Sequence, residues 1–155
     1  MTRSLLSPLR WLSPPLILAA ACSGEPEVAE ISTAEYGCLH IAEGQLADVS
    51  TERNAAVTLS LGRDPYRINM LPDVPGFVAL ELGAETPVVV LTDFAGTLSA
   101  VWRGDEREEL PEGAPDPYCD EDIPEHHELT LAAGTNHLEL GPVYQGNVWL
   151  MIAEP

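Results

Sequence analysis

The sequence predicts an all-β protein that forms a single β-sandwich of jelly-roll or immunoglobulin-like kind, with about seven or eight strands. Three observations support this prediction. Short apolar stretches alternate with polar residues at a period of two, which is the spacing of a strand with one buried face. Clusters of Gly, Pro, Asn and Asp separate these stretches. No sustained helical period occurs between them.

Eight stretches are predicted as strands: 55–61, 66–71, 77–82, 87–92, 97–102, 128–133, 136–140 and 148–153. The first alternates apolar with polar side chains, which is typical of a strand with one buried face. In the third, Val78, Leu80 and Leu82 share a face. The fourth contains Val88 to Leu91 in an unbroken apolar run, which predicts a central strand covered on both faces. Asp93 to Gly96 is expected to turn it into the fifth strand as a hairpin.

The sixth and seventh stretches flank Gly134, which predicts a second hairpin with a two-residue turn. In that register Leu131 faces Leu138, and both are expected to point toward the core. His137 and Glu139 then point away from it. The last stretch is rich in apolar residues on both faces.

The chain begins with a segment typical of an export signal. Arg3 and Arg10 form its basic part, and its apolar run is too short and too interrupted to span a bilayer. Leu18-Ala19-Ala20-Ala21-Cys22 resembles the lipobox of bacterial lipoproteins, with the leucine one position further back than in the family's pattern. The resemblance implies that residues 1–21 are a signal peptide and that Cys22 carries lipid. Ordinary secretion is the alternative, because the small residues also fit the usual cleavage rule.

The same resemblance implies a location. Ser23 rather than Asp follows the cysteine, and the sorting rule of Gram-negative lipoproteins then points to the outer membrane, with the protein facing the periplasm. Residues 22–33 are polar and acidic and are predicted to be the lipidated cysteine and a solvated linker. Residues 34–155 are predicted to form the sandwich domain. Ser32 could cap a short helix.

Three cysteines are present, and lipid on Cys22 would leave Cys38 and Cys119 as an even pair. Because an exported protein lies in an oxidising compartment, these two are predicted to form a disulfide. Two unpaired buried thiols are the alternative.

The charge balance is strongly acidic, with 25 Asp and Glu against 7 Arg and no Lys. Such a chain lacks the basic surface that phosphate backbones require, so nucleic acid is excluded as a partner. It also cannot attach to anionic membranes by charge. The membrane is therefore expected to be a partner only through the lipid anchor.

The most acidic segment, residues 105–128, is a candidate metal-binding loop. Asp120, Asp122, His126 and His127 are its candidate ligands, for calcium or for copper or zinc. The segment lacks the spacing of an EF-hand. A long solvated loop fastened by the disulfide is the alternative, and in that case no cofactor is expected.

No motif indicates an enzyme, since the chain lacks G-x-S-x-G, H-E-x-x-H, C-x-x-C and a phosphate-binding glycine loop. The closing segment 127–142 resembles the ending of small all-β lipoproteins and of pre-peptidase-type jelly-roll domains, which bears on fold alone. The sequence therefore predicts a non-catalytic lipoprotein that binds or braces another envelope protein. A divalent-metal-binding lipoprotein is the second hypothesis.

Overall fold

The computed structural model describes residues 31–155 of the chain. The predicted signal peptide, Cys22 and the linker up to residue 30 lie outside the described residues, so they stay predictions. Within the described part, no helix is long and apolar enough to cross a membrane.

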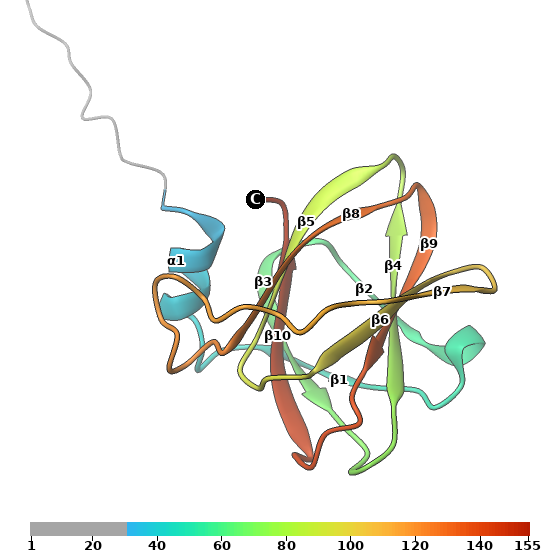
Figure 1. The fold of residues 1–155 in the computed structure, drawn as a ribbon, viewed down its shortest axis with the longest axis horizontal. Coiled ribbons are helices and arrows are strands. Elements are labelled where there is room, and N and C mark those ends of the chain that lie inside the picture. The colour runs from blue at the N-terminus through green and yellow to red at the C-terminus, as the bar shows by residue number, and fades with distance from the viewer. Residues whose placement is uncertain (1–30) are drawn as a thin grey trace, which may run out of the picture.

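In residues 31–155, ten strands form two five-stranded sheets that pack as a β-sandwich (Figure 1). The predicted all-β sandwich is confirmed, with ten strands rather than seven or eight. Sheet A has the order β1 (Gln45–Asp48), β3 (Gly62–Asn69), β10 (Asn147–Ala153), β5 (Thr86–Thr92) and β8 (Glu125–Leu131). Sheet B has the order β2 (Val57–Leu59), β4 (Gly76–Leu82), β9 (Gly134–Leu140), β6 (Leu98–Arg103) and β7 (Glu106–Glu109).

The two strands that the sequence pattern misses, β1 and β7, lie at the edges of the sheets. Their side chains are mostly exposed, so neither shows the alternation of a half-buried strand. Strand β3 also begins earlier than predicted, at Gly62, and includes Pro65. The pairing of β10 with β3 is irregular between Leu150 and Ile152, beside this proline. A residue without an N–H is tolerated where the ladder is interrupted.

Consecutive strands alternate between the sheets, except β6 and β7, which form a hairpin in sheet B. Both predicted hairpins are therefore wrong. Strand β5 pairs with β10 and β8, while β6 pairs with β9 and β7. Likewise β8 pairs with β5, and β9 pairs with β4 and β6. Leu131 and Leu138 are both fully buried as expected, but they reach the core from opposite sheets.

The main core fills the space between the sheets. Val88 and Val90 of β5 point into it, whereas Val89 and Leu91 belong to a second apolar cluster on the outer face of sheet A. Strand β5 is therefore covered on both faces, as its unbroken apolar run predicts.

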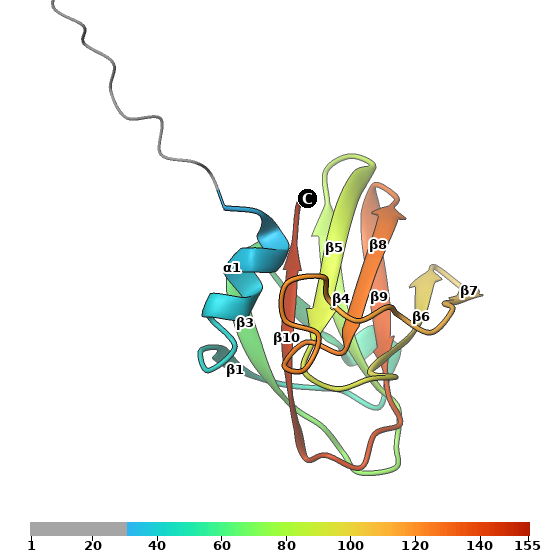
Figure 2. The same ribbon diagram turned by 60° about the vertical axis from the view of Figure 1, so that its left-hand side comes forward.

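Helix α1 (Thr33–Leu39) and the β7–β8 loop contribute to this second cluster, on the side of sheet A away from sheet B (Figure 2). Ser32 caps the helix, and its Oγ accepts a hydrogen bond from Glu35 N at 3.1 Å. The predicted disulfide between Cys38 and Cys119 is confirmed, and it joins α1 to the loop. Thr33 Oγ1 donates a hydrogen bond to Glu154 O at 2.7 Å, so α1 begins beside the C-terminal end of β10. A short 3-10 helix, η1 (Arg53–Ala55), lies beside β4.

Candidate functional site

The structure does not bring the four predicted metal ligands together. Asp120 and Asp122 are exposed on the β7–β8 loop, close to the disulfide in sequence. His126 and His127 are consecutive residues of β8, so their side chains point to opposite faces of sheet A. His127 is 5% exposed and points into the sandwich, whereas His126 points to the outer face.

Among the described residues, one group of three potential ligands lies within 4.8 Å, and it consists of Cys38, Asp116 and Cys119. Both sulfurs belong to the disulfide, so they cannot bind a metal as thiolates. The group is therefore a disulfide beside a carboxylate, and the sequence pattern does not single out Asp116.

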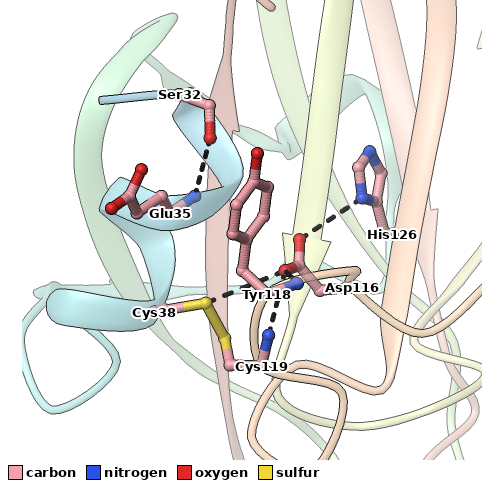
Figure 3. The surroundings of a disulfide bond; sticks show 7 residues. All are labelled: Ser32, Glu35, Cys38, Asp116, Tyr118, Cys119 and His126. Atoms are coloured by element: carbon pink, nitrogen blue, oxygen red, sulfur yellow. Dashed lines mark hydrogen bonds and ion pairs between the residues drawn. A yellow bond between two sulfur atoms is a disulfide. The ribbon is translucent and has the colours of Figure 1, made fainter. Parts of the chain in front are cut away.

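Asp116 connects the disulfide to His126 (Figure 3). Its carboxylate is fully buried. Oδ1 accepts hydrogen bonds from Tyr118 N at 2.8 Å and Cys119 N at 3.3 Å, and it lies 3.7 Å from Cys38 Sγ. Oδ2 lies 3.3 Å from His126 Nδ1. The loop thus holds this carboxylate in one orientation against the imidazole.

A second carboxylate and imidazole form a pair inside the sandwich. Glu125 is 1% exposed, and its Oε1 lies 2.9 Å from His127 Nε2. Glu125 Oε2 accepts hydrogen bonds from Thr92 Oγ1 at 2.9 Å, Thr97 N at 2.8 Å and Leu98 N at 3.2 Å. Because Thr92 ends β5 in sheet A and Leu98 begins β6 in sheet B, Glu125 ties the two sheets together where the chain crosses between them.

A third carboxylate, Glu139, lies on the outer face of sheet B. Its two oxygens accept hydrogen bonds from the Arg107 guanidinium, with Nε to Oε2 at 3.0 Å and Nη2 to Oε1 at 2.9 Å. Trp102 Nε1 donates to Oε2 at 2.6 Å, and Ser99 Oγ lies 3.2 Å from Oε1. This bidentate contact fixes the orientation of the Arg107 guanidinium and the Glu139 carboxylate. It joins β7 to β9 across β6.

Contacts on this face shift the pKa values of Glu139, Arg107 and His137. The hydrogen bonds from Arg107 hold the pKa of the Glu139 carboxyl below its ordinary value, and the bond from Trp102 adds to the effect. The same carboxylate, with that of Glu109, raises the pKa of Arg107. Partial burial and the charge of Arg53 lower the pKa of His137, so the neutral imidazole is favoured there.

Trp102 lines an open cavity on this face. Arg53 Cζ lies 4.2 Å from the centroid of the Trp102 ring, and Arg107 Cζ lies 6.0 Å from it. The cavity has a volume of about 360 Å³ and is lined by Arg53, Asn54, Phe77 and Trp102. We call this the Trp102 face. Its residues come from η1, β4 and β6, and no sequence motif joins them.

No protein-family model and no curated protein matches this chain.

Proposed function

We propose that this chain is a non-catalytic lipoprotein of the cell envelope that binds another envelope protein through the Trp102 face. The anchor is lipid on Cys22, and the linker from there to the cap of α1 joins it to the domain, since Ser32 and Thr33 already belong to the fold. The outer membrane facing the periplasm is the proposed location. The cavity between Arg53, Asn54, Phe77 and Trp102 is the observation that carries the binding role.

We also propose that the sandwich is a jelly roll. Strands β3 to β10 fall into two groups of four, β3-β10-β5-β8 and β4-β9-β6-β7, and their single hairpin is β6–β7. A double-sheet jelly roll has eight strands in two Greek keys. An immunoglobulin-like sandwich keeps more consecutive strands within one sheet, which makes it the poorer match.

The hydrogen bonds of the buried carboxylates Glu125 and Glu139 support a non-catalytic role. Glu125 bonds to the crossing between the sheets, and Glu139 bonds to three neighbouring side chains. Groups that act as a general acid or base must reach a substrate proton. Carboxylates committed to bonds of this kind serve the architecture of the sandwich.

The composition of the Trp102 face supports a protein partner. Trp and Arg are enriched among the residues that dominate the energy of protein–protein interfaces, and such residues lie in pockets with polar surroundings. Arg53 is held on the ring by stacking and by one ion pair to Asp105, whose side chain is fully exposed. Exposed ion pairs contribute little stability, so a partner can displace Asp105 at small cost.

The binding role is tested by site-specific photo-crosslinking in producing cells. A photoreactive residue at position 54, beside the cavity, is expected to give one discrete adduct that mass spectrometry identifies. The matched control is position 46 on β1, where Leu46 is 77% exposed on the other sheet. Arg53→Ala in the crosslinking chain is expected to weaken the adduct severalfold. Equal adducts from both positions, or an adduct that Arg53→Ala leaves unchanged, would contradict a binding role for this face.

The anchor is tested separately by the intact mass of membrane-extracted protein. Loss of residues 1–21 and a mass gain from acyl chains on Cys22 are expected. Cys22→Ser is expected to release the domain from the membrane, because a chain this acidic has no basic patch to hold it there. Membrane association that survives this substitution contradicts the anchor and leaves the binding role of the Trp102 face untouched.

A further inference from the structure

We propose that His126 and Glu128 hold a divalent transition-metal ion of the Zn²⁺ type, with Asp116 as the residue that positions the imidazole. This site differs from the set Asp120, Asp122, His126 and His127 predicted from the sequence. It lies on sheet A, on the opposite side of the sandwich from the Trp102 face, and does not depend on the protein-binding role.

The spacing of the two ligands suits one ion. His126 and Glu128 are two residues apart on β8, so both side chains lie on the outer face of sheet A. His126 Nε2 and Glu128 Oε1 are 3.9 Å apart. In tetrahedral coordination, two donors that each lie about 2.1 Å from Zn²⁺ are about 3.4 Å apart, which is about 0.5 Å closer than these two atoms. One ion can therefore join these atoms with little movement of either side chain.

The imidazole is oriented as metal-binding histidines are. A histidine ligand usually donates its other ring N–H to a carboxylate or a carbonyl, which fixes the ring and raises its basicity. Asp116 Oδ2 lies 3.3 Å from His126 Nδ1, at ion-pair distance, and has no hydrogen-bond partner among the described residues, so a small rotation of the ring would complete this bond. The hydrogen bonds to Asp116 Oδ1 from Tyr118 N and Cys119 N hold that carboxylate in place. With the proton on Nδ1, the lone pair that binds metal is on Nε2, on the side of Glu128.

The environment of His126 Nε2 is a second observation that points to a bound ligand. Nε2 is one of five buried side-chain atoms among the described residues that have no hydrogen-bond partner, and it faces a second potential ligand, Glu128, across 3.9 Å. Buried polar side-chain atoms in folded proteins are nearly always paired, so an isolated one requires an explanation.

The ligand types of His126 and Glu128 indicate the class of ion. The cavity beside them has room for further ligands. An imidazole with one carboxylate favours Zn²⁺ or a similar transition metal over Ca²⁺, which prefers six to eight oxygens. A cavity of about 210 Å³ adjoins both side chains, and its lining includes Thr33, Val89 and Tyr118. Tetrahedral coordination then has two positions that water or an incoming donor group fills.

The test is calorimetric titration of the full chain, purified without a histidine tag, with Zn²⁺ and in parallel with Ca²⁺. One Zn²⁺ per chain is expected. His126→Ala and Glu128→Gln are each expected to weaken binding at least tenfold. Glu128 is 82% exposed, so its substitution leaves the fold intact even if His126→Ala does not fold. The matched controls, His137→Ala in sheet B and Glu121→Gln in the exposed loop, are expected to bind like wild type.

The role of Asp116 has its own readout. Asp116→Asn is expected to weaken Zn²⁺ binding about tenfold and to change the pH at which protons compete with the metal. Absence of Zn²⁺ binding at 1:1 stoichiometry would overturn the proposal and leave His126 as an ion-pairing residue between two carboxylates. So would Zn²⁺ binding that neither His126→Ala nor Glu128→Gln changes, or a preference for Ca²⁺.

Discussion

Glu125 Oε1 lies 2.9 Å from His127 Nε2 inside the sandwich, and both side chains are almost completely buried. The pair sits where β5 crosses from sheet A to β6 in sheet B, and Glu125 bonds to both ends of that crossing. A buried carboxylate is costly unless it is hydrogen-bonded, and here both oxygens of Glu125 have partners. The Glu125–His127 pair therefore has a structural role, because Glu125 links the two sheets by hydrogen bonds.

Substitution of Glu125 is expected to destabilise the fold strongly. Glu125→Ala leaves the Thr97 and Leu98 N–H groups and His127 without their acceptor, and loss of one partner from a buried pair costs about 3 to 5 kcal/mol. Urea unfolding followed by circular dichroism measures the change. The matched control is Glu128→Gln on the same strand, which is expected to change the free energy of unfolding by less than about 0.5 kcal/mol. Equal effects of the two substitutions would refute the structural role.

Gly113 covers the same pair, and its lack of a side chain is required there. A Cβ at this position would lie 2.7 Å from Glu125 Cγ and 2.7 Å from His127 Nε2, both in packed side chains. Gly113→Ala is therefore expected to destabilise the fold by about 1 to 3 kcal/mol, as overpacking does. A Cβ at Gly83 meets no atom within 4 Å, so Gly83→Ala is expected to be neutral or slightly stabilising. The melting temperatures of the two variants give the comparison.

The fold shows what a period of two can and cannot predict. The pattern identifies the core-facing side chains, such as Leu131 and Leu138, because burial of one face imposes alternation. It cannot identify the pairing partner, since two strands across a core and two strands in a hairpin carry the same pattern. The period-two pattern does not identify the edge strands β1 and β7, because their side chains are mostly exposed.

The pairs His126–Glu128 and Glu125–His127 were missed because of one strand boundary. The sequence pattern starts a strand at residue 128, whereas β8 begins at Glu125. With the observed start, a period of two places Glu125 and His127 in the core and His126 with Glu128 on the outer face. Asp116 and the Trp102 face could not be predicted in this way, because they combine segments that only the tertiary fold brings together. The disulfide could be predicted, since the proposed use of Cys22 leaves a single pair.

The disulfide is expected to contribute a large part of the stability. Cys38 and Cys119 are 81 residues apart in sequence, and the chain-entropy model assigns closure of such a loop about 4.5 kcal/mol. The double substitution Cys38→Ser/Cys119→Ser should lower the urea midpoint by a corresponding amount without changing the slope much. Wild type unfolded in a thiol reductant serves as the control and should match the double variant. Unchanged stability of both would contradict the value that the chain-entropy model assigns to this bridge.

Stability is expected to fall in acid partly through Glu139. The folded-state pKa of this carboxyl lies below the ordinary value of 4.5, mainly because of the Arg107 hydrogen bonds. A lowered folded-state pKa stabilises the fold fully above about pH 4.5, and this contribution is lost as the pH falls through the folded-state pKa. His137 acts in the same direction at higher pH, because its folded-state pKa lies below 6.5 and protonation therefore favours the unfolded chain.

Glu139→Gln separates the carboxylate contribution from every other titrating group. At pH 7 the substitution should lower the free energy of unfolding by about 2 kcal/mol, the scale of hydrogen bonds to a charged group. As the pH falls below 4.5, the wild-type carboxylate takes up a proton and the difference between the two proteins should shrink. Urea midpoints measured at several pH values for both proteins give this difference directly. A difference that stays constant down to pH 2 would mean that the geometry of the amide, and not the charge of Glu139, causes the loss.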